Sequence, residues 1–276
     1  MASAVVCAEA PGLDPRRESS SLLFYRAVRD LKPVWMLEDI RTMEACYQEE
    51  DTLRTYSPSE ALLYAIVHDH QAYALYLLTH YPEQALDSPG ERFCCGSPSP
   101  HLSMAVRYDR QSILGLIVQE SRRALRPDPE DLVHLACELQ RSEALLLLLG
   151  TGADPLSLDR DGRTPLDVLL EKLRDSGPGG IHRERRQCLD TLLLFMSRLR
   201  FRMRATLERD PELWTGLLGE DTFRYLSGRS PAPLLMAAMR AVLGGLRPQE
   251  FPQNLQQLPV PAALLLGQTQ PSWTSK

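Results

Sequence analysis

Two short clusters in this chain carry residue types that could do chemistry, namely His68-Asp69-His70 and Cys94-Cys95. Imidazole and thiolate groups are zinc ligands, and two adjacent thiols could also form a redox-active pair. Neither cluster has the usual zinc spacing, such as Cys-x2-Cys or two histidines on one helix face. We therefore expect turn-forming histidines and ordinary loop thiols, with no bound metal and no other cofactor. A redox or metal role for Cys94-Cys95 is the alternative.

The sequence contains no motif typical of a catalytic site. It lacks a Gly-x-Ser-x-Gly nucleophile turn, a phosphate-binding loop and a dinucleotide-binding fingerprint. Arginines are frequent between residues 183 and 209. A solvated face is the expected explanation for them, and a contact with protein or phosphate is the alternative. The sequence predicts a non-catalytic protein.

The amino-acid composition limits the kinds of binding partner and the cellular compartment that can be expected for this protein. The 276-residue chain has a formal net charge of −5, so we expect no nucleic-acid partner. It has neither a signal-peptide pattern nor an apolar run long enough to span a membrane. Its six cysteines have no disulfide-framework spacing. These features predict a cytosolic protein without membrane insertion.

Lysine is rare in this chain. Only Lys32, Lys172 and Lys276 are lysines among its 31 basic residues. A GC-rich coding sequence would favour arginine in this way. A protein that works beside a ubiquitin-transfer enzyme would also benefit from having few lysines, because the lysine amine is the acceptor in that reaction. The sequence leaves both explanations open.

A repeated pattern organises the middle of the chain, residues 56–197. The first three repeats share an apolar residue, an alanine three positions later, and then an apolar run. The register positions are Ala65, Ala105, Ala136 and, in the fourth repeat, Leu169. A small side chain lets two antiparallel helices approach closely, and the apolar run is the buried face of the second helix. The pattern predicts an all-α solenoid of about four degenerate units.

The last two units resemble ankyrin repeats most clearly. The spacing is close to the ankyrin period of about 33 residues, and Gly152-Ala153-Asp154 and Thr164-Pro165-Leu166 match its best-known fragments. The resemblance implies that His134 hydrogen-bonds between repeats. We expect a disordered tail over 1–20, a helical cap over 21–55, and a helical bridge over 198–229. Within the cap we expect a helix from Val34 to Tyr47, and within the bridge a helix over 198–209.

The resemblance also implies a recognition surface for a target protein. Hairpin tips and the exposed sides of the first helices line the concave groove of such arrays. The residues at these positions are His68, Asp69, Arg107, Tyr108, Asp109, Glu138, Gln140 and Arg141. Each of them could equally be a solvent-facing polar residue.

A nearly uncharged segment, Pro233 to Leu243, predicts a short helix near the C-terminus. Leu234, Ala238 and Val242 lie four apart on one stripe. Together with Pro233 they resemble the elongin-binding element of the SOCS box, with Ala238 where cysteine is commonest. Further on, Leu258, Pro259, Val260 and Pro261 resemble the cullin-binding element of the cullin-5 type. The resemblance implies a SOCS-box-like segment over 230–267, followed by a tail over 268–276.

Together, the two resemblances imply a substrate receptor of a cullin-RING E3 ubiquitin ligase. Its partners would be elongins B and C, cullin-5 with its RING protein, and a target that is ubiquitinated and degraded. We assign the Leu234 stripe to elongin, and Leu235, Met239 and Leu243 to packing on the bridge helices. The alternatives are that the helix 233–243 only packs on its own chain, and that the protein is an ankyrin scaffold without a ligase role.

Overall fold

A computed structural model describes residues 23–43, 47–49, 52–89, 99–123, 130–175 and 183–256. The chain forms two compact units, Met1–Gly96 and Ser97–Lys276. No helix within the described ranges combines the length and apolarity needed to cross a membrane. Three sequence predictions lie outside the described residues: the disordered tail, the cullin-binding role of Leu258 to Pro261, and the loop thiols Cys94-Cys95.

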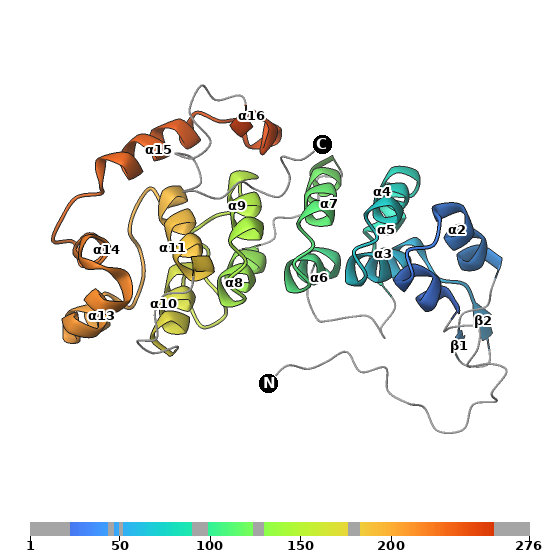
Figure 1. Ribbon diagram of the computed structural model, residues 1–276, viewed down its shortest axis with the longest axis horizontal. Helices are drawn as coiled ribbons and strands as arrows, with labels where there is room; N and C mark the ends of the chain where they lie inside the picture. The colour runs from blue at the N-terminus through green and yellow to red at the C-terminus, as the bar shows by residue number, and fades with distance from the viewer. Residues whose placement is uncertain are drawn as a thin grey trace. The chain divides into compact units, whose positions relative to one another are not determined.

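The first unit consists of the N-terminal cap and the first helix pair (Figure 1). A helix over 23–29 precedes α2 (Val34–Met43), β1 (Tyr47–Glu49), β2 (Thr52–Arg54), α3 (Pro58–Val67), α4 (Gln71–His80) and α5 (Pro82–Ala85). The two strands pair antiparallel and form a small hairpin that the sequence pattern did not predict. Helices α3 and α4 form the first predicted repeat, and Ala65 between them is fully buried. Ser57 begins α3 with a reciprocal capping box to Glu60.

The cap helix α2 differs from its prediction in length and in its buried face. It ends at Met43, whereas the expected helix continued to Tyr47, which lies in β1. The spacing of apolar residues in the sequence places Trp35 on the buried face of this helix, but Trp35 is 64% exposed, while Leu37 is fully buried. The apolar pattern identified the wrong side of α2 as the buried side. Arg41 lies one turn after Leu37 and is also buried, at 6% exposed, but a charged residue does not contribute to an apolar pattern.

The second unit contains three further helix pairs, stacked in two layers (Figure 1). The first helices of the pairs are α6 (Pro100–Arg107), α8 (Glu130–Glu138) and α10 (Pro165–Asp175), and the second helices are α7 (Gln111–Arg123), α9 (Ser142–Gly150) and α11 (Arg183–Phe195). α6 packs on α8 and α8 on α10, while α7 packs on α9 and α9 on α11. Ala105, Ala136 and Leu169 are fully buried. The predicted all-α solenoid and its register are confirmed.

The turns inside the first three helix pairs share one backbone conformation. After the first helix, one residue takes a positive φ, at Asp69 (56°), Asp109 (58°) and Gln140 (58°). The next amide N–H then donates to the carbonyl of the register alanine, at 2.8 Å from His70 to Ala65 and 2.9 Å in the other two turns. This is the Schellman arrangement, which satisfies carbonyls left open at a helix end. The register alanine therefore serves both the helix contact and the turn.

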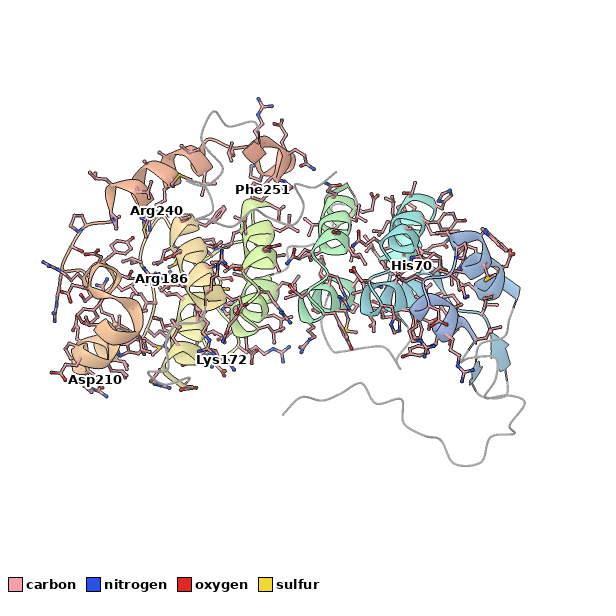
Figure 2. The ribbon with its side chains drawn as sticks, in the orientation of Figure 1. His70, Lys172, Arg186, Asp210, Arg240 and Phe251 are labelled. Atoms are coloured by element: carbon pink, nitrogen blue, oxygen red, sulfur yellow. The ribbon has the colours of Figure 1, made fainter. Side chains whose placement is uncertain are left out.

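The bridge and the C-terminal helices complete the second unit. They are α12 (Arg204–Arg209), α13 (Pro211–Leu218), α14 (Glu220–Leu226), α15 (Leu234–Gly244), the 3-10 helix η2 (Pro248–Glu250) and α16 (Gln253–Gln256). The helix predicted over 198–209 is wrong in its first half, because it begins only at Arg204. Arg186 of α11 donates to the Leu218 carbonyl (2.6 Å) and to the Thr222 hydroxyl (3.1 Å), which ties the bridge to the last repeat (Figure 2).

Candidate protein-interaction site

Among the described residues of the second unit, the most exposed large apolar side chains lie on α15. Leu234 is 89% exposed and Leu235 is 61% exposed. Ala238 is exposed as well, and Val242 is half-buried. Pro233 precedes the first turn, at the N-cap, and is exposed. Three of the four residues predicted to contact elongin therefore lie on α15, with Pro233 at its N-cap, and Val242 is less exposed than Leu234.

The opposite side of α15 packs on the repeat array. Met239 is 6% exposed and forms a buried cluster with Leu146 of α9 and Phe251. Around this cluster lie five partly buried side chains, Leu147, Leu194, Phe195, Leu243 and Leu246. Met239 and Leu243 thus face inward as expected, but onto α9 and α11 and not onto the bridge. Leu235 does not share this face, and it extends the exposed surface beside Leu234.

Arg240, the one charged residue of α15, holds the helix in this rotation. Its Nε and Nη2 donate to the Leu193 carbonyl at 3.1 and 2.6 Å, and Nη2 also donates to the Tyr225 hydroxyl at 2.7 Å. Leu193 lies in the last turn of α11, where carbonyls lack partners within the helix. Figure 2 shows Arg240 on the side of α15 that faces α11. One guanidinium therefore connects α15 to both α11 and α14.

The Phe251 ring, which follows α15 in the chain, packs directly against Gly150 of α9. A Cβ added to Gly150 would overlap the Phe251 ring, which is itself only 3% exposed. We expect Gly150→Ala to displace this ring, at a cost of about 1–3 kcal/mol in the free energy of unfolding. Hydrogen exchange measured by mass spectrometry should show faster exchange over residues 246–256.

A matched control for this change is Gly115→Ala, also in the second helix of a repeat. A Cβ there meets only the Leu147 Cδ2 at an ordinary 4.0 Å. This variant should gain roughly 0.5–1 kcal/mol from helix propensity. Unchanged exchange over 246–256 in Gly150→Ala would show that Phe251 does not hold the C-terminal segment.

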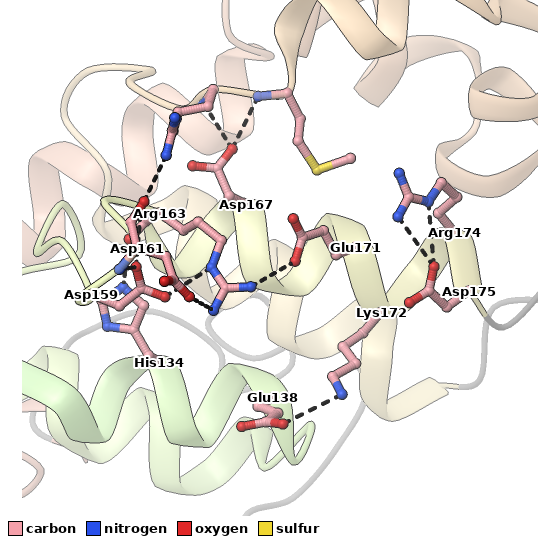
Figure 3. Close-up of polar contacts among 12 residues, drawn as sticks. His134, Glu138, Asp159, Asp161, Arg163, Asp167, Glu171, Lys172, Arg174 and Asp175 are labelled. Carbon is pink, nitrogen blue, oxygen red and sulfur yellow. Dashed lines mark hydrogen bonds and ion pairs between the residues drawn. The ribbon is translucent and has the colours of Figure 1, made fainter.

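The residues predicted to bind a target lie in both units. His68 and Asp69 form the turn of the first unit, and the other six lie in the second unit, on α6, on α8 and in the turns that follow them. Four of the six contact a neighbouring repeat: Asp109 pairs with Arg141 (3.2 Å), Glu138 with Lys172 (3.4 Å; Figure 3), and Gln140 with Arg185 (2.9 Å). Tyr108 is 40% exposed. Lys172 and Arg185 were missed because the sequence does not show which residues of adjacent units meet.

The candidate histidines serve the fold. His70 Nδ1 accepts the Tyr73 N–H (3.3 Å) at the start of α4, so its Nε2 carries the proton and donates to the Lys32 carbonyl (2.9 Å). Both ring nitrogens are therefore used. His134 Nε2 contacts the Arg163 carbonyl of the next repeat at 2.9 Å, which is the predicted contact between repeats. In the described part of the chain, no group of three or more His, Cys, Asp or Glu side chains is placed to hold a metal ion.

Two buried thiols lie between the helices of the array. Cys137 of α8 and Cys188 of α11 are free and fully buried. Burial raises the pKa of the Cys137 thiol well above its ordinary value and raises the pKa of Cys188 to about 12. Both are therefore protonated at neutral pH and act as small apolar residues.

The stacked helix pairs, the alanine register and the contact made by His134 define an ankyrin repeat protein. The chain is 40% identical over 286 residues to Ankyrin repeat domain-containing protein 9 of Mus musculus, and the match covers 89% of this chain and 88% of the relative. It belongs to the family of ankyrin repeat proteins that this relative represents. No family model matches the chain, and no solved structure matches it. Ankyrin repeat proteins are protein-interaction modules.

Proposed function

We propose that this ankyrin repeat protein is a cytosolic, non-catalytic substrate receptor of a cullin-RING ubiquitin ligase. The repeat array would bind a target protein. The C-terminal segment would dock elongins B and C and a cullin of the cullin-5 type with its RING protein. By holding the target near the ubiquitin-loaded enzyme, the receptor would raise its effective concentration for transfer. The chemistry then belongs to the partners, so this chain needs no catalytic residue.

The exposed apolar face of α15 is the observation that carries this proposal. A leucine that is 89% exposed, next to one that is 61% exposed, contributes apolar surface that the chain itself leaves in water. Helix faces of this kind commonly bind in a groove on a partner. The inward face and Arg240 already hold α15 on the array, so binding would not require the helix to be ordered first.

The array supports the other half of the proposal. Its hairpin turns present polar and aromatic side chains on a rigid scaffold, as recognition surfaces of repeat proteins do. The contacts between Asp109 and Arg141 and between Gln140 and Arg185 fix these side chains before a target arrives. The scarcity of lysine fits a protein that works beside a ubiquitin-transfer enzyme.

The test is co-purification of the full chain with elongins B and C. Leu234→Asp should reduce elongin recovery about tenfold or more, because a charge would replace the most exposed apolar anchor of α15. The substitution should leave the fold intact, since the side chain makes little contact with the rest of the protein. Recovery is measured by quantitative mass spectrometry against the wild-type protein.

Leu158→Asp is the matched control, because Leu158 is also an exposed leucine of the second unit, at 54%. It should retain elongin at the wild-type level. A wild-type protein that recovers neither elongin nor cullin would contradict the receptor role and leave the ankyrin scaffold as the function. Equal losses in both variants would show that α15 is not the docking site.

A further inference from the structure

Lys172 brings an amine into the surface predicted to bind a target. It lies in the last turn of α10, and its Nζ is 3.4 Å from Oε1 of Glu138 on α8 (Figure 3). Glu138 is one of the residues that the resemblance to ankyrin repeats assigns to target binding. The side chain of Lys172 is 42% exposed, so a partner protein can reach the amine.

The ion pair with Glu138 does not itself require a lysine. Other ion pairs of the second unit use arginine, since Arg141 pairs with Asp109 and Arg163 pairs with three carboxylates. An arginine would keep the charge and present more N–H donors to the carboxylate. What a lysine adds at this position is an amine that can act as a nucleophile. Such amines are rare in a chain with three lysines among 31 basic residues.

Lys172 and the docking helix α15 lie at opposite edges of the second unit. Arg240 attaches α15 to the Leu193 carbonyl in the last turn of α11. Lys172 lies at the other end of the helix pairs, where α8 ends and Glu138 and Gln140 are found. Figure 2 shows Lys172 and Arg240 on opposite sides of this unit. A partner bound to the exposed face of α15 would therefore leave the amine of Lys172 uncovered.

We propose that Lys172 is the site at which the target-free receptor is itself ubiquitinated. This inference rests on the proposed function, because the ligase supplies the conjugating enzyme that carries ubiquitin as a thioester. Lys172 shares a compact unit with α15, whereas Lys32 belongs to the first unit. An exposed ion pair is weak, so the contact with Glu138 is readily broken.

The reaction is an acyl transfer from sulfur to nitrogen. Nζ of Lys172 attacks the thioester carbonyl at the C-terminus of ubiquitin. The C–N bond of an isopeptide forms, and the C–S bond to the cysteine of the conjugating enzyme breaks. The lysine ammonium gives up two protons, one to the leaving thiolate and one to the solvent. No oxidant or metal ion takes part in this balance.

The test is a ubiquitination reaction of the full chain in complex with elongins B and C, cullin-5 and its RING protein. No target is added, because a target bound over Glu138 would cover the amine. Tandem mass spectrometry after trypsin digestion locates the Gly-Gly remnant, which should lie mainly on Lys172. Lys172→Arg should lower modification of this chain about tenfold, because arginine keeps the charge beside Glu138 but is not an acceptor.

Lys32→Arg is the matched control, and it should leave modification of the chain unchanged. Elongin recovery and the discharge of ubiquitin from the conjugating enzyme to free lysine measure the proposed function separately. If the complex forms and discharges ubiquitin, but the chain stays unmodified or carries the remnant mainly on Lys32 or Lys276, this inference is overturned and the receptor role stands. If the wild-type chain recovers neither elongin nor cullin, both are overturned.

Discussion

Replacing Asp167 by alanine should lower the free energy of unfolding of the second unit by about 4 kcal/mol. The carboxylate is almost fully buried and accepts four hydrogen bonds. Oδ2 accepts the N–H (3.0 Å) and the hydroxyl (2.8 Å) of Thr164. Oδ1 accepts the N–H groups of Arg202 and Met203. A buried donor left without its acceptor costs about 1–3 kcal/mol, so alanine would leave several such costs at once.

The loss should appear in thermal unfolding as a decrease in Tm of roughly 10 °C for a unit of this size. Asp167→Asn should have an intermediate effect, because the amide keeps one oxygen but turns an N–H2 group toward donors. Asp175→Ala, at the exposed end of the same helix, is the control and should stay within about 0.5 kcal/mol. An Asp167→Ala protein as stable as the control would show that this carboxylate does not hold the bridge to the array.

Asp167 also shows which contacts could be predicted from the sequence and which could not. Thr164-Pro165-Leu166 predicted the start of a repeat, and the structure places a helix start there, with Thr164 and Asp167 exchanging hydrogen bonds. The second role of the carboxylate depends on Arg202 and Met203, which are distant in sequence and come close only once α11 has folded back. No local pattern encodes such a pair.

The segment 198–204 shows a different reason for a wrong prediction. Leu199, Met203 and Leu207 lie four apart, which favours a helix, but Leu199, Phe201 and Met203 also alternate with arginine. Both periods fit the same residues. Asp167 opposes the helix, because its carboxylate accepts two N–H groups that a continuing helix would bond to its own carbonyls.

The candidate site on α15 was partly predictable for a similar reason. The apolar composition and the flanking Pro and Gly residues predicted the helix. The stripe of Leu234, Ala238 and Val242 was predicted from the helical period. Which of the remaining faces of α15 packs on the protein depends on the shape of the surface that α15 covers. That surface is made by Leu146, Leu194, Phe195 and by Phe251 seated on Gly150. Leu235 was therefore assigned to the wrong side.

Acid should destabilise the first unit through Glu38. This carboxylate and Arg41 form a paired contact, with Nε to Oε1 at 2.8 Å and Nη2 to Oε2 at 2.7 Å, and their side chains are 12% and 8% exposed. The hydroxyl groups of Tyr73 (2.7 Å) and Tyr81 (3.3 Å) also donate to Glu38. Burial alone would raise the pKa of Glu38, but the hydrogen bonds and the charge of Arg41 together hold it below the ordinary 4.5.

The sign of the pH dependence follows from this lowered pKa. The unfolded chain binds a proton at Glu38 more readily than the folded chain does, so protonation favours unfolding. The stabilisation is fully present above the unfolded pKa of about 4.5 and is lost as the pH falls through the lower pKa of the folded state. Glu38→Gln should remove this part of the acid sensitivity.

At neutral pH, Glu38→Gln should also cost about 3 kcal/mol, because it leaves the Arg41 charge buried without its partner. Hydrogen exchange over residues 33–43 and 71–80, followed from neutral pH to pH 3 after correction for the intrinsic exchange rate, reports on this unit alone. Asp39→Asn is the control, since it removes the same charge from the next, exposed residue. If the protection of the wild type and of Glu38→Gln fell equally over this range, other carboxylates would account for the acid sensitivity of the cap.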